Sequence, residues 1–159
     1  MSRLAVIGAG SWGTALAIAL APRFDSVHLW ARDCDHAAEI TRLRENRRYL
    51  GGFLLPGHVD VSGDLGRATA GADFVLSAVP CPHLRSVLHT MRPHLSPRAR
   101  VVSGSKGIEG KTLYRVSQVI SEVLSCPSLP PVAVISGPTF AREVAAGEPA
   151  AVVIASEDT

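Results

Sequence analysis

Short apolar runs alternate with longer helix-forming stretches along this chain. Residues 3–10 are a short apolar run that ends in glycines, and residues 11–21 after it are rich in strong helix formers, which predicts a strand, a turn and a helix. A second apolar run at residues 26–30 precedes a helical pattern that opens at Asp33. A β-α-β-α unit is therefore complete within the first 45 residues.

The alternation resumes after a Gly- and Pro-rich loop at residues 46–58. Further strands are expected at residues 59–61, 73–79, 99–104, 131–137 and 150–156, and further helices from residue 64 and over 83–91, 112–124 and 139–147. Residues 112–124 are expected to form the longest amphipathic helix. Because the strands are apolar throughout, we expect a mainly parallel sheet covered on both faces, a doubly wound α/β fold of the Rossmann type in one domain over residues 1–159.

Composition and charge exclude several classes of function. A net charge of +2 does not indicate a nucleic-acid partner, and the cluster Arg44, Arg47 and Arg48 is interpreted as a solvated helix end. The three cysteines are widely spaced and have no histidine at ligand spacing, so neither a disulfide framework nor a metal site is expected. No apolar run reaches the roughly 18 residues of a membrane span, and no signal peptide is evident. These features predict a cytoplasmic protein without membrane insertion.

Residues 8–13, Gly-Ala-Gly-Ser-Trp-Gly, match the G-x-G-x-x-G pattern directly after the first strand and at the start of the first helix. In that context Gly8 makes the tight turn, Gly10 lets the backbone approach a pyrophosphate, and Gly13 lets the helix pack on the strand. The free N–H groups of the helix supply the anion site. The turn predicts a dinucleotide cofactor.

The second strand is followed by Arg32 and Asp33, where a dinucleotide fold reads the adenosine ribose. Asp33 also has the character of a helix N-cap. We therefore assign the cofactor contact to Arg32, which favours NADP with NAD tolerated; a solvated surface arginine is the alternative.

Lysine is rare in this chain: fourteen of the sixteen basic residues are arginine, and Lys106 and Lys111 are the only lysines. Both lie in the glycine-rich segment 101–111 after an expected strand. An ammonium on a flexible stem suits a compact charge beside a ligand. We expect Lys106 to serve that purpose and Lys111 to be a solvated charge, while Glu109 and Glu143 form no acid/base pair.

Several ordered motifs resemble one family over essentially the whole chain: "GAGSWGTALA", "VHLWARD", "NRRYL", "SAVPCPHLRSVL", "SKGIEG" and "ISGPTFAREVAAGEPAAVVIAS". They resemble the bacterial NAD(P)-dependent glycerol-3-phosphate dehydrogenases. The resemblance implies the cofactor-binding half of an enzyme that interconverts dihydroxyacetone phosphate and sn-glycerol 3-phosphate for phospholipid synthesis, with NADP or NAD as cofactor. One departure is Cys81, where the family pattern suggests a serine.

The resemblance also implies roles for single residues. Cofactor contacts are expected from the glycine turn and from Ser11, Trp12, Arg32, Tyr49, Lys106 and Ala141. Substrate contacts are expected from Lys106, Gly137 and Thr139. No acid/base residue is expected in this chain, because the family pattern continues into a helical second domain that carries the acid/base lysine; the chain alone is expected to be inactive. The oligomeric state stays open, with a homodimer considered for the full-length protein.

Three alternatives remain at this point. One is a reductase of the same fold that acts on another small oxo acid or on a sugar nucleotide. Another is a nucleotide-sensing Rossmann domain that binds without turnover. A methyltransferase on the same sheet topology is disfavoured by the complete glycine motif and by Arg32.

Overall fold

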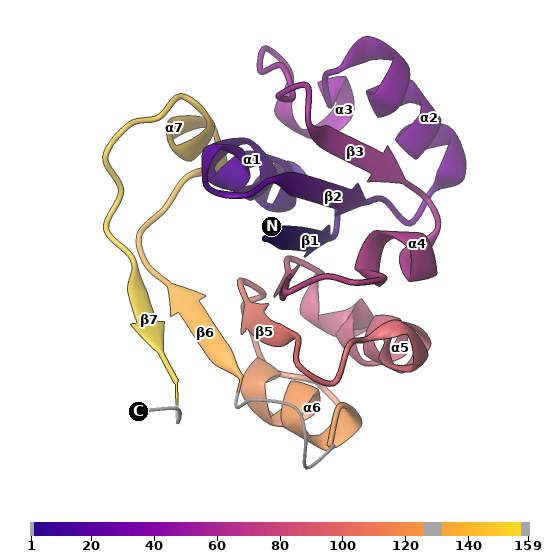
Figure 1. The fold of residues 1–159 in the computed structure, drawn as a ribbon. Coiled ribbons are helices and arrows are strands. Elements are labelled where there is room, and N and C mark those ends of the chain that lie inside the picture. Colours follow the sequence, from indigo (N-terminus) through magenta and orange to yellow (C-terminus); the bar gives the residue numbers. More distant parts are fainter. Residues whose placement is uncertain (1, 126–131, 157–159) are drawn as a thin grey trace.

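The computed structural model describes residues 2–125 and 132–156, and its centre is a single sheet (Figure 1). Within these residues the sheet has seven strands in the order β3-β2-β1-β4-β5-β6-β7. The strands are β1 (Arg3–Ile7), β2 (Ser26–Trp30), β3 (Val59–Ser62), β4 (Phe74–Ser77), β5 (Arg100–Ser103), β6 (Ala133–Ser136) and β7 (Val153–Ala155). All neighbouring strands pair in parallel except β6 and β7, which are antiparallel. The mainly parallel sheet is confirmed.

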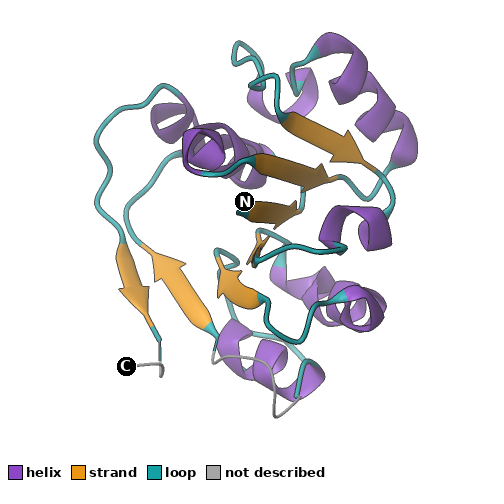
Figure 2. Ribbon diagram, viewed as in Figure 1, coloured by secondary structure: helices purple, strands orange, loops and turns teal. Residues whose placement is uncertain are grey.

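Helices lie on either side of this sheet (Figure 2). They are α1 (Ser11–Leu20), α2 (Cys34–Leu43), α3 (Arg47–Leu50), α4 (Leu65–Thr69), α5 (Cys81–Met91), α6 (Val116–Val123) and α7 (Ala141–Ala145), with short 3₁₀ turns at Ala21–Arg23 and Arg92–His94. No helix in the described part of the chain is long and apolar enough to span a bilayer.

Strand β1 shows why its sequence is apolar at every position after Arg3. Leu4 and Val6 belong to the core that α1 and α2 cover, whereas Ala5 and Ile7 belong to the core under α4, α5 and α6. Successive side chains of a strand point to opposite faces, so a strand covered on both faces buries every residue. The two cores confirm the doubly wound α/β fold of the Rossmann type.

Helix α6 begins later than the sequence pattern predicts. Residues 112–115 are outside it, and the longest described helix is α5, of 11 residues. The reason is a closed turn: the Glu109 N–H donates to the Tyr114 carbonyl at 2.9 Å, and the Leu113 N–H donates to the Glu109 carbonyl at 2.8 Å. Leu113 has a φ of 60°, which is incompatible with a right-handed helix. The expected length of this helix was wrong, although its apolar face is buried.

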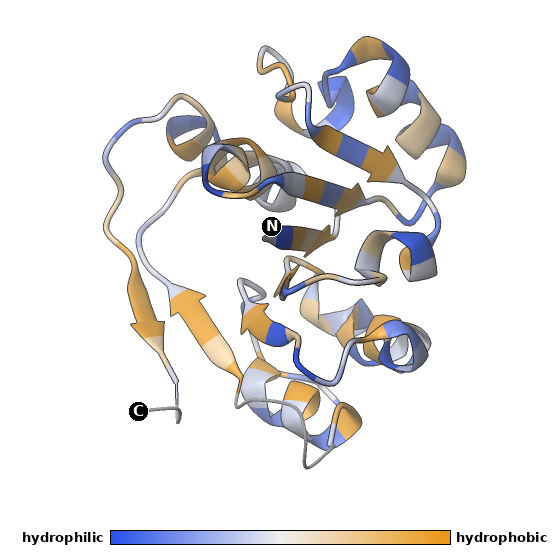
Figure 3. Cartoon of the chain, viewed as in Figure 1, coloured by the Kyte–Doolittle hydropathy of each residue, from blue (hydrophilic) through white to orange (hydrophobic). Residues whose placement is uncertain are grey.

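The expected coverage of the sheet is incomplete at its β7 edge. Phe140, Val153 and Ile154 are 68%, 68% and 66% exposed. Figure 3 shows β6 and β7 as an apolar pair of strands at this edge of the molecule. Isolated exposed apolar residues are ordinary, but a contiguous group indicates a surface that another part of a protein covers. We call Phe140, Val152, Val153 and Ile154 the β7 strip.

Candidate functional site

The glycine turn between β1 and α1 has a separate structural reason at each glycine. Gly8 has a φ of 115°, and a Cβ there would lie 2.9 Å from the Ala78 carbonyl oxygen. A Cβ on Gly13 would lie 1.8 Å from the Gly8 carbonyl oxygen. A Cβ on Gly10 would meet no protein atom within 4 Å, and the φ of Gly10 is an ordinary −76°. The fold therefore explains Gly8 and Gly13, whereas Gly10 leaves free space at the turn.

Gly10 is also the N-cap of α1, and no side chain caps this helix. The first N–H groups of a helix have no partners within the helix, and together with the helix dipole they attract an anion. The turn and the uncapped helix start thus form an anion-binding arrangement of the kind that holds a pyrophosphate.

A cavity of about 370 Å³ opens beside the turn. It is lined by Gly8–Gly10, Trp30–Asp33, His36, Arg48, Tyr49, Ala78–Pro80, His83 and Val87. It lies at the carboxyl ends of β1, β2 and β4. Strands β2 and β3 lie on one side of β1, and the later strands, from β4 on, lie on the other side, so the order of the strands reverses here. This switch point is where open α/β sheets bind ligands.

Arg32 and Asp33 have different roles at the end of β2. The Asp33 carboxylate accepts hydrogen bonds from the N–H groups of Asp35 at 3.0 Å and His36 at 3.3 Å, so the expected N-cap is confirmed. Arg32 is exposed and lines the cavity. Both cap bonds go to Asp33 Oδ1 and Asp33 also lines the cavity, so the exposed Arg32 guanidinium places a positive charge beside a carboxylate at this position.

Tyr49 and Arg48 line the same cavity from α3, a helix of four residues within the segment expected to be a loop. The Arg48 guanidinium lies 5.2 Å from the centroid of the Tyr49 ring, and the His36 ring meets that ring edge-on at 5.4 Å. The interpretation of Arg48 as part of a solvated helix end missed its place on the cavity wall. His83, at the start of α5, also lines this wall.

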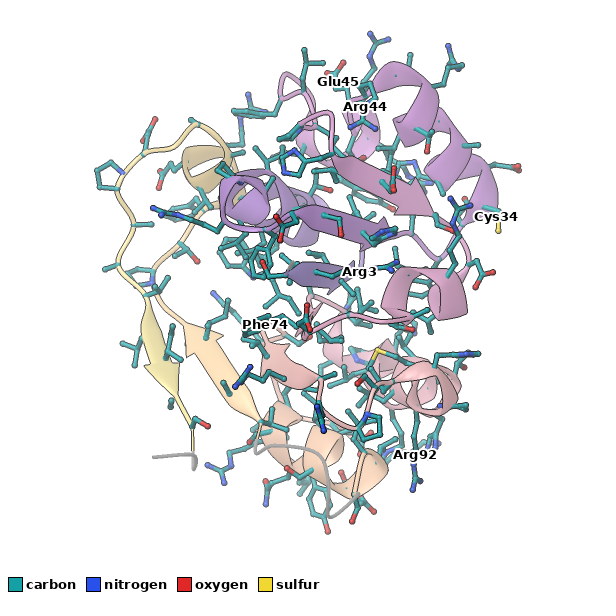
Figure 4. All side chains as sticks on the ribbon, in the orientation of Figure 1. Arg3, Cys34, Arg44, Glu45, Phe74 and Arg92 are labelled. Atoms are coloured by element: carbon teal, nitrogen blue, oxygen red, sulfur yellow. The ribbon has the colours of Figure 1, made fainter. Side chains whose placement is uncertain are left out.

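The approach to α3 is held by Arg44 and Glu45, which lie close together beside α2 (Figure 4). Arg44 ends α2 with a φ of 54°, and its guanidinium donates to the Leu55 and Pro56 carbonyls. Glu45 accepts hydrogen bonds from the Gly52 N–H at 2.8 Å and the Arg47 guanidinium at 3.0 Å. The Gly52 bond, followed by the Arg47 bond, lowers the pKa of Glu45. These contacts fold the loop back on α3.

Lys106 lies on the loop after β5, next to residues from two other predicted motifs. Its ammonium donates to the Gly137 carbonyl oxygen at 3.3 Å and lies 5.9 Å from the centroid of the Trp12 ring. The Trp12 indole Nε1 is buried and has no hydrogen-bond partner among the described residues.

The remaining predicted residues lie around this second group. The Thr139 N–H donates to the Gly137 carbonyl at 3.0 Å, which places the substrate positions expected at 137 and 139 side by side. Gly137 also has a role in the fold, because a Cβ there would lie 2.3 Å from the Ala151 carbonyl oxygen. Ser11 and Ala141 are the first residues of α1 and α7, and neither lines the cavity beside Arg32.

An ion pair secures the loop that carries Lys106. Glu109 accepts two hydrogen bonds from Arg85 of α5, at 2.8 and 2.9 Å, and Arg85 also bonds Glu122 of α6 at 2.9 Å. The Arg85 bonds, with a further bond from the Thr112 hydroxyl, lower the pKa of Glu109 to about 2. Glu109 is therefore ionised near neutral pH and is unsuited to donate a proton there.

The described residues, 2–125 and 132–156, contain no group of three or more His, Cys, Asp or Glu side chains that could bind a metal ion.

Comparison with known proteins identifies glycerol-3-phosphate dehydrogenases among the relatives of this chain. The NAD(P)+ glycerol-3-phosphate dehydrogenases of Koribacter versatilis and Nitratidesulfovibrio vulgaris are 45% and 47% identical to this chain, over 159 and 156 residues. The alignments cover 99% and 98% of this chain and 47% of each relative. The chain thus spans about half the length of these relatives.

Solved structures agree. A crystal structure of glycerol-3-phosphate dehydrogenase from Coxiella burnetii matches with a TM-score of 0.90 and 36% identity, over 99% of this chain and 47% of that one. The Plasmodium falciparum glycerol-3-phosphate dehydrogenase matches with a TM-score of 0.85 and 27% identity, over 99% and 46%. The family model for the N-terminus of NAD-dependent glycerol-3-phosphate dehydrogenase matches residues 3–159. The resemblance seen in the motifs is confirmed, and the chain belongs to this family of glycerol-3-phosphate dehydrogenase amino-terminal domains.

Proposed function

We propose that this chain is the cofactor-binding part of a dehydrogenase that interconverts dihydroxyacetone phosphate and sn-glycerol 3-phosphate with NADP or NAD, and that it serves phospholipid synthesis. The observation that carries the proposal is the glycine turn. Gly8 and Gly13 are required by the fold, whereas the space at Gly10, beside an uncapped helix start, is the space that a pyrophosphate needs. Because the relatives are twice as long, the activity belongs to the whole protein.

For the adenosine end of the cofactor, the proposal assigns Arg32 to the 2′-phosphate. The exposed guanidinium lines the cavity, and the neighbouring Asp33 is occupied as a cap. Tyr49 lines the same cavity, with Arg48 over its ring. An arginine beside the ribose favours NADP, because it can hold the 2′-phosphate. NAD lacks this phosphate and is expected to bind more weakly.

For the reacting end, the proposal assigns Lys106, Trp12, Gly137 and Thr139. A bound nicotinamide supplies or accepts the hydride, and the protein orients the substrate and stabilises charge on its oxygen. The Lys106 ammonium is a point charge suited to that oxygen. Gly137 and Thr139 present their backbone next to this ammonium. Ser11 and Ala141 stay predicted cofactor contacts at the starts of α1 and α7.

The proposal divides the whole protein into this dinucleotide-binding domain, residues 1–159, and a second, helical domain with the acid/base lysine. The relatives' length supports it, and so does the β7 strip, since exposed apolar residues on and next to an edge strand favour a covering partner. A homodimer of the whole protein is part of the proposal. So is a cytoplasmic location, which the free thiols of Cys34 and Cys81 support.

The test has two arms. Titration of the purified 159-residue chain with NADPH and NADH, followed by nicotinamide fluorescence, should show binding of both, with NADPH tighter. The same chain should not oxidise NADPH with dihydroxyacetone phosphate, because the missing acid/base group alone contributes about 10² to 10⁴-fold. Appreciable turnover by this chain would contradict the assignment of the acid/base residue to a second domain. Failure to bind either dinucleotide would overturn the proposed function itself.

A further inference from the structure

Asn46 is a fully buried polar side chain between the glycine turn and the Tyr49 wall of the cavity. Its amide Nδ2 donates to the Ala9 carbonyl oxygen at 2.9 Å and to the Thr14 hydroxyl at 2.8 Å. Its Oδ1 accepts from the Tyr49 N–H at 3.3 Å. The side chain thereby joins three segments that contribute to one site: the turn, helix α1 and helix α3.

The orientation of this amide follows from its partners. The Ala9 carbonyl oxygen can only accept, so the atom facing it must be the Nδ2 donor. Both N–H groups of the amide and one lone pair of its oxygen are then used at a site that water does not reach. Buried polar groups that are fully satisfied in this way specify one local arrangement.

The contact with Ala9 has a direct consequence for the anion site. In a trans peptide the carbonyl of Ala9 and the N–H of Gly10 point in opposite directions. By holding that carbonyl in the interior, Asn46 points the Gly10 N–H away from the buried amide. Within the described residues this N–H donates to no protein acceptor.

The contact with Tyr49 acts on helix α3, which lines the same cavity. Helix α3 has four residues, too few to be stable in isolation, and Asn46 is its N-cap. The cap therefore determines where Arg48 and Tyr49 stand relative to the turn. Together with the Arg44 and Glu45 contacts, this cap holds α3 next to the glycine turn.

We propose that Asn46 is a positioning residue for dinucleotide binding: it orients the peptide between Ala9 and Gly10 toward the ligand and holds the Tyr49 wall at a matching distance. The proposal rests on the proposed cofactor function. It differs from the role of Arg32, because Asn46 reaches parts of the site that NADPH and NADH share. Its loss is expected to weaken both cofactors by a similar factor.

The experiment measures dissociation constants of NADPH and NADH for the 159-residue chain and its variants at a temperature where all are folded. Asn46→Asp keeps the acceptor for the Tyr49 N–H but sets an oxygen against the Ala9 carbonyl oxygen. It should raise both dissociation constants by about tenfold or more, as expected for a lost buried hydrogen bond.

Thr69→Ala is the matched control. Thr69 is fully buried, and its hydroxyl bonds to the Leu65 carbonyl within α4, away from the cavity. It should lower the melting temperature and leave both dissociation constants unchanged. If Asn46→Asp lowers only the melting temperature as well, Asn46 is merely structural and the proposal is overturned.

If Asn46→Asp does not fold, substitutions of Thr14 test the positioning role instead. Thr14→Val removes one acceptor of the Asn46 amide and should weaken both cofactors severalfold, whereas Thr14→Ser should restore binding. Unchanged binding by Thr14→Val, or no rescue by Thr14→Ser, would overturn the proposal.

A spectroscopic measurement separates this inference from the proposed function. In ¹⁵N–¹H spectra of the ligand-free chain, Asn46→Asp should shift the Gly10 and Tyr49 amide signals, while Thr69→Ala should leave them in place. If the parent chain binds no dinucleotide, the proposed function fails, and the spectra still report whether Asn46 orients the turn. Unshifted Gly10 and Tyr49 signals would overturn the positioning role.

Discussion

Lys106 donates a hydrogen bond from its ammonium to the Gly137 carbonyl oxygen, at 3.3 Å, and so joins the loop after β5 to the end of β6. The two residues come from separate motifs, and both were expected near the substrate. Their contact means that the ammonium is held beside a backbone that can also contact a small polar ligand. The Trp12 ring lies on the same side, 5.9 Å away.

The need for an ammonium at this position is testable in the whole protein. Lys106→Met should lower kcat/KM by at least about a hundredfold, the scale observed when one preorganised donor to a developing oxyanion is lost. Lys106→Arg should rescue it poorly, because the guanidinium is planar and bulkier. Lys111→Arg, in the same loop, is the control and should be nearly silent. If Lys106→Arg keeps most of the activity, any cation suffices and the assignment of an ammonium is wrong.

Cofactor preference tests Arg32. Arg32→Ala should weaken NADPH binding by about tenfold to a hundredfold, the equivalent of one lost charge-assisted hydrogen bond, and leave NADH binding nearly unchanged. Arg98→Ala is a suitable control, since Arg98 is exposed and precedes β5 at the opposite end of the sheet. Isothermal titration with both cofactors makes the measurement. Equal losses for NADPH and NADH would contradict a contact with the 2′-phosphate.

The pH dependence of stability tests the Arg85–Glu109 pair. A carboxylate whose pKa in the folded protein is about 2, below its ordinary value of 4.5, stabilises the fold above pH 4.5, and this contribution is lost as the pH falls toward 2. The parent chain should therefore unfold at a higher urea concentration than Glu109→Gln at pH 7, and the difference should shrink as the pH is lowered.

Glu122→Gln serves as the comparison for that experiment. Glu122 bonds the same Arg85, but its side chain is 53% exposed, against 13% for Glu109. Exposed pairs contribute little, so this variant should lose less stability at pH 7. A gap between parent and Glu109→Gln that stays constant from pH 7 to pH 2.5 would show that the pair does not contribute through ionisation.

Much of the fold could be predicted, because the signals were local. Residues 4–7 show the burial of their strand on both faces through continuous apolar content, and Asp33 caps its helix through neighbouring N–H groups. What could not be predicted depends on distant partners. Helix α3 is capped by an asparagine anchored to Ala9, 37 residues away. The helix expected from residue 112 begins later, because a turn closes between Glu109 and Tyr114.

The candidate site also contains residues that the sequence could indicate and residues that it could not. The glycine turn and Lys106 carry their own signals, one through a motif and the other through the rarity of lysine. Arg48 carried none, because an arginine next to other arginines has the appearance of a solvated helix end until α3 turns it toward Tyr49. His83 also lines the cavity, and a histidine at a helix start suits both solvent and a cavity wall. The individual ligand contacts stay predictions.

The central claim is that the open space at Gly10 is the space of a bound dinucleotide, and a pair of glycine substitutions tests it most directly. Gly13→Ala should unfold the chain or greatly lower its melting temperature, because its Cβ would lie 1.8 Å from the Gly8 carbonyl oxygen. Gly10→Ala has ordinary backbone angles and no protein atom within 4 Å of the new Cβ, so it should melt like the parent chain. The decisive measurement is the NADPH dissociation constant of Gly10→Ala: the account predicts an increase of about tenfold or more, from overpacking against the ligand, in a normally folded protein, and an unchanged dissociation constant would contradict it.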